Sequence, residues 1–281
     1  MKLRRYKNLV PDSPLHWQLE HLLRENGGRV SVAAVCEQVL RLPGTDSGLA
    51  VLLVEGLIED DARLRVHPDG TVEWAEPAAA ELWQACRRFA VVDVETTNGR
   101  RGDQHIIEIG ICAVEGGQVT QEWASLVNPE RTIPYWVQQL TGISDAAVQG
   151  APRFEELAPR LLDELEDTIL VGHHARFDVA CLNAELTRLL GKRLSNPYLC
   201  TAELARRFLP GSDNYRLHTL SQWLRLTHAQ PHRAGSDARA TAELFCHLLG
   251  AVTAPWHQYL RPRSPTPPAE KIPETESPAI S

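Results

Sequence analysis

Hydrophobic residues at helical spacing open the chain, and alternating ones follow them before residue 75. Ser13 can cap a first helix, in which leucines recur every three or four positions, and Ser31 and Asp46 can cap a second and a third helix. Apolar residues then alternate on both sides of a Pro-Asp-Gly turn at 68–70, which predicts a β-hairpin. Three helices and a hairpin suggest a small winged-helix-like α+β domain over residues 1–76. A helical cap on the next domain is the alternative.

The third of these helices would be the recognition helix of a winged-helix fold. Residues 48–54 carry no basic side chain that could reach the edges of bases, so we do not expect this helix to read duplex DNA. Contact with a protein is the alternative role for this domain.

A helix predicted over residues 77–88 connects this domain to a second one, which begins with a pattern of apolar strands. Phe89 to Val94 is an apolar run interrupted only by Asp93, which is typical of a central buried strand. Hairpin strands come next and βα alternation comes later, which predicts a mixed sheet with helices over residues 89–250. The expected strands are 106–114, 118–127, 169–172 and 198–201, and the expected helices are 154–165 and 177–190.

Composition narrows the function classes. The chain has 281 residues, enough for about two domains, and its net charge of −7 argues against a protein that coats nucleic acid electrostatically. That charge does not exclude an enzyme that holds a few phosphates through metal ions. The six cysteines form no CxxC pair and most lie in apolar segments, so we expect neither zinc sites nor disulfides.

Targeting signals and membrane spans are not expected. The apolar stretches fall short of the roughly 20 residues that a bilayer requires. The basic N-terminus is not followed by the apolar run of a secretory signal, so the protein is expected in the cytoplasm, with no membrane partner. Residues 261–281 are rich in proline and predicted to be a disordered tail.

Two carboxylates stand at the end of the first strand of the second domain. Asp93 and Glu95 are two residues apart, so their side chains point to the same face, with Cα atoms ~7 Å apart. A divalent cation between them would offset their repulsion, and carboxylate oxygens suit Mg²⁺ or Mn²⁺. The alternative is a pair of acids that emerges into solvent at a strand end.

Three further candidates lie later in the chain. Asp178 opens a helix after the strand at 169–172, where an acid often serves only as a cap. His232 and Asp237 lie in a loop that leads into a helix, and a single loop histidine is usually an ordinary surface residue. Their significance therefore depends on the whole set.

The set resembles a known family. Its three motifs occur in the order Asp93-Val94-Glu95-Thr96-Thr97, His173 to Asp178, and His232-Arg233-Ala234-Gly235-Ser236-Asp237. This order is similar to that of the DnaQ-like DEDDh 3′-5′ exonucleases, which include the epsilon proofreading subunit of DNA polymerase III and RNase T-like proteins. The resemblance spans residues 88–250 and includes 107–110 and 140–143. It implies an RNase H-like fold, a mixed five-stranded sheet flanked by helices.

The resemblance also implies roles for individual residues. The acids Asp93, Glu95, Asp178 and Asp237 would bind two divalent ions, Mg²⁺ or Mn²⁺, and His232 would take the proton from the attacking water. The expected substrate contacts are Thr96, Thr97, Leu140, Thr141, Gly142, His173 and Phe177.

Aromatic residues and two departures from the family pattern complete the picture. Tyr135 or Trp136 could stack an unpaired base, whereas Trp123 and Trp223 are expected in the core. Asn98 stands where the family commonly has glycine, and an asparagine tolerates the turn. His174 replaces an asparagine, which bears on substrate choice.

The expected function is metal-dependent 3′-5′ exonuclease activity that releases nucleoside 5′-monophosphates from single-stranded or frayed 3′ ends. DNA is favoured over RNA, and a replication or repair protein could bind the N-terminal domain or the tail. The alternatives are RNA 3′-end trimming and a non-catalytic adaptor.

Overall fold

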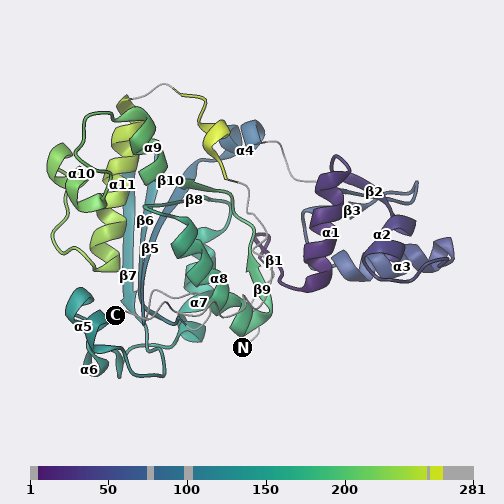
Figure 1. Cartoon of the computed structure of the whole chain (residues 1–281), viewed down its shortest axis with the longest axis horizontal. Helices are drawn as coiled ribbons and strands as arrows, with labels where there is room; N and C mark the ends of the chain where they lie inside the picture. Colours follow the sequence, from purple (N-terminus) through teal and green to yellow (C-terminus); the bar gives the residue numbers. More distant parts are fainter. Residues whose placement is uncertain (1–5, 75–78, 98–103, 252–253, 262–281) are drawn as a thin grey trace, which may run out of the picture. The chain divides into compact units, whose positions relative to one another are not determined.

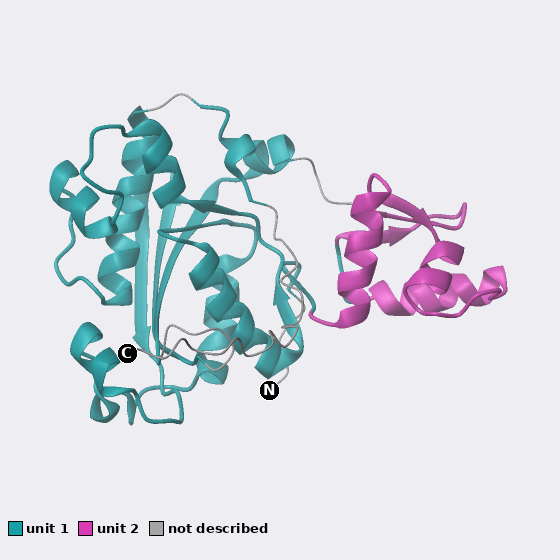
Figure 2. Cartoon of the chain, viewed as in Figure 1, with its two compact units in different colours: residues 1–11, 60–62, 75–263 teal, residues 12–59, 63–74, 264–281 magenta. Residues whose placement is uncertain are grey.

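The structure is a computed structural model, which describes residues 6–74, 79–97, 104–251 and 254–261. Within these residues the chain divides into two compact units (Figure 2). The larger unit comprises residues 6–11, 60–62 and those from 79 onward, and the smaller unit comprises residues 12–59 and 63–74. This division differs at its start from the boundary predicted at residue 76.

The difference arises from a short strand near the N-terminus. β1 (Leu9–Pro11) pairs antiparallel with β9 (Lys192–Leu194), so residues before the first helix belong to the larger unit. Lys192 also forms an ion pair of 2.9 Å with Asp60, which lies in the same unit. A strand of three residues is too short for its periodicity to be read from the sequence.

A five-stranded mixed sheet forms the centre of the larger unit (Figure 1). The two pairs that involve β6 are antiparallel, and β8 lies parallel to its two neighbours. This arrangement confirms the predicted mixed sheet. In the order β10-β8-β5-β6-β7 the strands are Tyr198–Cys200, Ile169–Gly172, Arg88–Thr96, Ile106–Glu115 and Gln118–Leu126.

Helices cover both faces of this sheet (Figure 1). α7 (Phe154–Leu165) and α8 (Arg176–Leu190) pack on the face that carries Val92 and Val94. The opposite face, which carries Val91, is covered by α9 (Thr201–Phe208), α10 (Leu217–Leu224) and α11 (Ala234–Ala251). Because side chains alternate along a strand, Asp93 and Glu95 lie on the α11 face.

Short helices complete this unit. α5 (Tyr135–Thr141) and α6 (Asp145–Val148) pack through their apolar residues on Ile107 of β6. A 3₁₀ turn at Trp256–Tyr259 packs near α4 (Ala79–Ala85). The predicted connecting helix ends earlier than expected, because Arg88 already pairs with Glu115 in the β5–β6 ladder.

Several predictions concern residues that the structure does not describe, and one prediction about a described residue was wrong. The start of the connecting helix, the Asn98 turn and the tail after residue 261 lie outside the described part of the chain. The prediction that Trp223 is a core residue was wrong, because its side chain is 46% exposed on α10. Trp123 is half-buried against the core, with Arg160 over its ring.

The smaller unit contains the predicted three helices and hairpin. Ser13, Ser31 and Asp46 accept the capping hydrogen bonds expected of them. An additional strand completes a three-stranded antiparallel sheet in the order β2-β4-β3. The elements are α1 (Pro14–Glu25), β2 (Arg29–Ser31), α2 (Val32–Gln38), α3 (Ser47–Ile58), β3 (Leu64–Val66) and β4 (Thr71–Trp74). Its winged-helix class stays a prediction.

In the described part of the chain, no helix combines the length and apolarity that crossing a membrane requires.

One glycine sets the distance between α11 and the sheet. A Cβ atom on Gly110 of β6 would lie 2.1 Å from the carbonyl oxygen of Ala234, at the start of α11. Any side chain at this position would push the first turn of α11 away from the strand. The first turn of α11, the helix that carries Asp237, therefore packs directly against the backbone of β6.

We predict that Gly110→Ala destabilises the larger unit. The added methyl group forces a backbone shift, which typically costs about 1 to 3 kcal/mol. Thermal unfolding would show a midpoint several degrees lower than that of the wild type. Gly150→Ala is the matched control, because a Cβ atom there meets nothing within 4 Å. An unchanged midpoint for Gly110→Ala would contradict the proposed close packing.

Candidate active site

Two of the predicted acids lie side by side on β5. Asp93 is opposite Gly110 of β6, and Glu95 is opposite Glu108. The register shifts directly after Glu95, so that Ile107 is an extra residue on β6. This irregularity turns Ile107 toward α5, whereas Glu108 stays on the α11 face with the two acids of β5.

Asp178 joins them from the other helical layer. It lies in the first turn of α8, and its Oδ1 atom accepts a hydrogen bond of 3.2 Å from the backbone N–H of Val94. Gly172 at the end of β8 permits this approach, because a Cβ atom there would lie 2.9 Å from the Cα atom of Ala175 and 3.2 Å from Asp178 Oδ2.

Asp237 completes the acid set from the first turn of α11. Its Oδ1 atom is 2.6 Å from His228 Nε2, and its Oδ2 atom accepts a hydrogen bond of 3.2 Å from the backbone N–H of His232. His232 is exposed and has a left-handed backbone with φ of 62°. One ligand atom each of Glu95, His232 and Asp237 lies within 4.8 Å of the others, so these residues could hold a metal ion.

Burial and mutual repulsion raise the pKa values of Asp93, Glu95 and Asp178. The pKa of Asp93 is raised well above its usual value, first by burial and then by the charges of its acidic neighbours. Burial, together with the charges of Asp237 and Glu108, raises the pKa of Glu95 to about 7, although Arg233 opposes the shift. Burial also raises the pKa of Asp178 to about 8, against the hydrogen bond from Val94. Carboxylates crowded in this way are the donor set that a hard divalent cation needs.

An ion pair between half-buried Arg233 and buried Glu108 fixes the loop that carries His232. Arg233 donates two hydrogen bonds to Glu108, of 2.7 and 3.1 Å, and the backbone N–H of Ala234 donates a third of 2.8 Å. Glu108 is 4% exposed. This pair was not predicted from the sequence, although an acid inside the apolar run 106–114 indicates that a buried charge needs a partner.

The residues predicted to contact substrate differ in their solvent exposure and in whether their polar groups are already hydrogen-bonded within the protein. Leu140 and Phe177 are 48% and 39% exposed. The hydroxyl group of Thr97 accepts a hydrogen bond from the backbone N–H of His105, and that of Thr141 donates one to the carbonyl oxygen of Val137. Thr96 is buried. Gly142 ends α5 with φ of 71°. The role of all six in substrate binding stays a prediction.

His173 is hydrogen-bonded within the protein through both ring nitrogens, and its role in substrate binding stays a prediction. Its Nε2 atom is 2.9 Å from the carbonyl oxygen of Tyr215, and its Nδ1 atom is 2.9 Å from the hydroxyl group of Thr201. Burial lowers its pKa to about 4, so the ring is neutral and Nε2 carries the proton that bonds the carbonyl. Both ring nitrogens are thus engaged within the protein. The neighbouring His174 is exposed, with φ of 76°.

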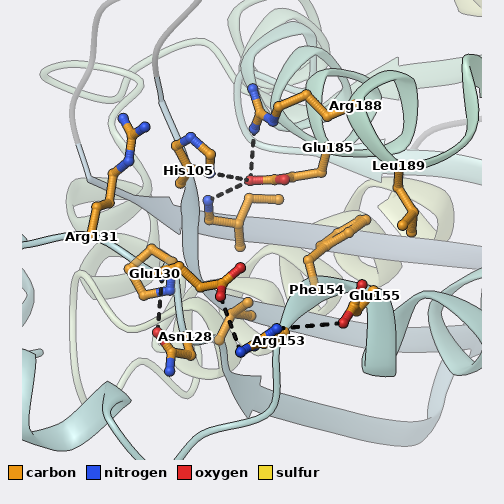
Figure 3. A pocket seen from close by; sticks show the side chains of 13 residues that line it. His105, Asn128, Glu130, Arg131, Arg153, Phe154, Glu155, Glu185, Arg188 and Leu189 are labelled. Atoms are coloured by element: carbon orange, nitrogen blue, oxygen red, sulfur yellow. Dashed lines mark hydrogen bonds and ion pairs between the residues drawn. The ribbon is translucent and has the colours of Figure 1, made fainter.

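A cavity of about 310 Å³ lies beside α8 (Figure 3). Glu185 forms ion pairs there with Arg188 at 2.8 Å and with His105 at 3.5 Å, and Arg153 pairs with Glu130 at 3.2 Å. Glu185 and Arg153 therefore each have a partner of opposite charge within the cavity lining. Of the described residues that line it, none is one of the four acids, so the candidate site is the acid cluster between α8 and α11.

Comparisons with known proteins agree with this geometry. Residues 90–245 match the RNase T family model, described as an exonuclease. The chain is 35% identical over 171 residues to the DNA polymerase III epsilon subunit of Aquifex aeolicus, covering 61% of this chain and 83% of that protein. It is 38% identical over 165 residues to the 3′-5′ exonuclease DinG of Bacillus subtilis, covering 58% of this chain but only 18% of that protein.

Solved structures share the fold. The nuclease domain of 3′hExo, a DEDDh family member bound to rAMP, superposes with a TM-score of 0.53 at 17% identity, covering 64% of this chain and 97% of that one. The predicted RNase H-like mixed sheet is confirmed.

We predict that Asp178→Asn stabilises the protein in chelator at high pH. The pKa of Asp178 is about 8 when folded and near 4 when unfolded, so the folded state binds more protons between these values. The contribution of Asp178 to stability is therefore lost as the pH rises through this window. Asparagine mimics the protonated form and keeps an acceptor for the Val94 amide.

Chemical denaturation in chelator at several pH values measures the effect. The stability of Asp178→Asn relative to wild type should increase by about 1 kcal/mol or more between pH 5 and pH 8. The exposed Asp213, changed to asparagine, is the control and should show no such trend. A difference that does not change with pH would contradict a raised pKa at Asp178.

Proposed function

The chain belongs to the RNase T family of 3′-5′ exonucleases, and we propose that it releases nucleoside 5′-monophosphates from single-stranded or frayed 3′ ends of DNA. The observation that carries the proposal is the convergence of Asp93, Glu95, Asp178 and Asp237 from three elements on one end of the sheet, with His232 beside them. The substrate, the roles of the residues and the metal are parts of the proposal.

The four acids would hold two divalent cations, Mg²⁺ or Mn²⁺. The raised pKa values of Asp93, Glu95 and Asp178 support this, because a crowded carboxylate cluster needs positive charge to remain ionised at neutral pH. Bound cations would supply activation of water and neutralisation of charge at the scissile phosphate. Hard oxygen donors without a cysteine favour Mg²⁺ or Mn²⁺ over zinc.

His232 would accept the proton of the attacking water. An imidazole is suited to exchanging protons near neutral pH, and the exposed ring can reach solvent. The ring is held at the site by its own backbone, since its N–H donates to Asp237 and the next residue, Arg233, is anchored on Glu108. The base and one ligand acid are thus positioned by the same loop.

DNA is the favoured substrate. The similar epsilon subunit belongs to a DNA polymerase, and that relative is matched over most of its length. On α5, Tyr135 and Trp136 are 75% and 56% exposed, and they could stack unpaired bases next to Leu140. Among the described residues of the site, none distinguishes ribose from deoxyribose, so RNA 3′-end trimming is the second candidate.

Two other aspects of the expected function belong to this proposal. A replication or repair protein would bind the smaller unit, where α3 exposes Leu49 and Leu52, or the tail after Leu260, and the protein would act in the cytoplasm. A pull-down with and without the tail tests the second site. The adaptor alternative is disfavoured, because the chain retains all four acids and the histidine.

We predict that Asp93→Ala and His232→Ala both abolish or strongly reduce the release of mononucleotides. Loss of a general base typically lowers the rate by about 10² to 10⁴-fold, and loss of a ligand acid should reduce activity to the level seen with chelator. The measurement is a time course on 5′-labelled oligonucleotide with Mn²⁺. Asp213→Asn serves as the control, and full activity of either alanine variant would refute the assigned roles.

We predict faster shortening of DNA than of RNA of the same sequence. Two 5′-labelled strands in parallel time courses, with Mn²⁺ and with chelator, give the ratio of kcat/KM. A ratio that favours RNA would support the trimming function. Degradation of neither strand by folded protein would favour the adaptor.

A further inference from the structure

We propose that His228 is a positioning residue of the active site, which holds the Asp237 carboxylate in the orientation that a divalent cation needs. This inference rests on the proposed function, because it takes Asp237 as a metal ligand. It adds a histidine that lies outside the three motifs, nine positions before Asp237 in the chain.

The contact between the two side chains is short and shielded from solvent. His228 Nε2 lies 2.6 Å from Asp237 Oδ1, and the two side chains are 6% and 14% exposed. Because an ionised carboxylate only accepts hydrogen bonds, Nε2 carries the proton and donates it. A charge-assisted hydrogen bond in such surroundings is among the strong ones.

The rest of the ring has no comparable polar contact. Its Nδ1 atom is buried and, within the described residues, has no hydrogen-bond partner. The ring of the exposed His218 lies beside it, with centroids 6.1 Å apart. Leaving a buried polar atom unpaired costs about 1 to 3 kcal/mol, so the fold tolerates this cost while directing the other nitrogen to Asp237.

The contacts of His228 differ from those of the other partly buried histidine near the site, His173. His173 bonds a backbone carbonyl with one nitrogen and the Thr201 hydroxyl group with the other. His228 instead bonds one of the four acids. This difference indicates that the Nε2 group of His228 acts on the acid cluster and not on the backbone of the fold.

Asp237 needs such support because it projects from the first turn of a helix. Its second oxygen accepts the backbone N–H of His232, so the two hydrogen bonds fix both carboxylate oxygens. A carboxylate offers about four lone-pair positions, and two remain for cations. Asp178 is fixed in a different way, by the backbone amide of Val94.

The test is Mn²⁺ binding by full-length protein, followed by the electron paramagnetic resonance signal of free Mn²⁺. His228→Leu removes the donor and should weaken binding about 10- to 100-fold, as loss of such a partner does at other metal sites. His228→Gln restores an N–H group at the Nε2 position and should bind within about threefold of wild type. His218→Gln is the matched control, and Asp237→Asn tests the ligand itself.

Activity supplies a second measurement. At saturating Mn²⁺ the kcat of His228→Leu should recover to within a few-fold of wild type, whereas that of His232→Ala should not. If the leucine variant does not fold, His228→Asn replaces it, because its shorter amide does not reach Asp237.

The outcomes separate this inference from the proposed function. Wild-type Mn²⁺ binding by His228→Leu, or equal weakening in His228→Leu and His228→Gln, would overturn the inference alone if Asp237→Asn still lost Mn²⁺. Unchanged binding by Asp237→Asn would overturn the proposed metal site as well.

Discussion

The repulsion between four carboxylates at one end of a buried sheet is the constraint on which the larger unit depends. Asp93 and Glu95 cannot move apart, because both belong to a strand that is paired on both sides. Their neighbours therefore supply the compensation: amides from Val94 and His232, and the guanidinium group of Arg233 beside Glu108. These contacts leave several carboxyl pKa values raised, so the compensation is incomplete, and the proposed cations would complete it.

The same constraint explains why glycines stand where the helices meet the sheet. Asp178 and Asp237 lie in first helical turns, and each helix approaches the strands over a residue without a side chain, Gly172 for α8 and Gly110 for α11. Apolar cores on both faces hold the helices in place. The acids are thus positioned by rigid elements, which is the kind of preorganisation that catalysis by oriented charges requires.

Sequence patterns predicted the strands, the main helices and the acids, because these depend on local periodicity and on motifs a few residues long. They did not predict contacts between distant segments. Glu108 and Arg233 are 125 positions apart, and their pairing follows only from the sheet register and from where α11 packs on the sheet. His228 has no motif of its own, and β1 is too short to show a period. Trp223 was misassigned because an apolar helical pattern does not reveal which edge of the helix remains uncovered.

Three histidines illustrate how burial and partners decide what one residue type does. His173 is partly buried with both nitrogens bonded, and its lowered pKa keeps the ring neutral. His232 is exposed, so its ring remains available for a proton, while its backbone amide holds Asp237. His228 lies between these cases, since it is buried with one nitrogen on the same carboxylate. Asp237 is therefore held from two sides by one loop, and a shift of that loop would move the proposed base, His232, and the proposed metal ligand, Asp237, together. This coupling would keep the distance between the proposed proton acceptor and the proposed cation site constant, as a reaction that depends on precise geometry requires.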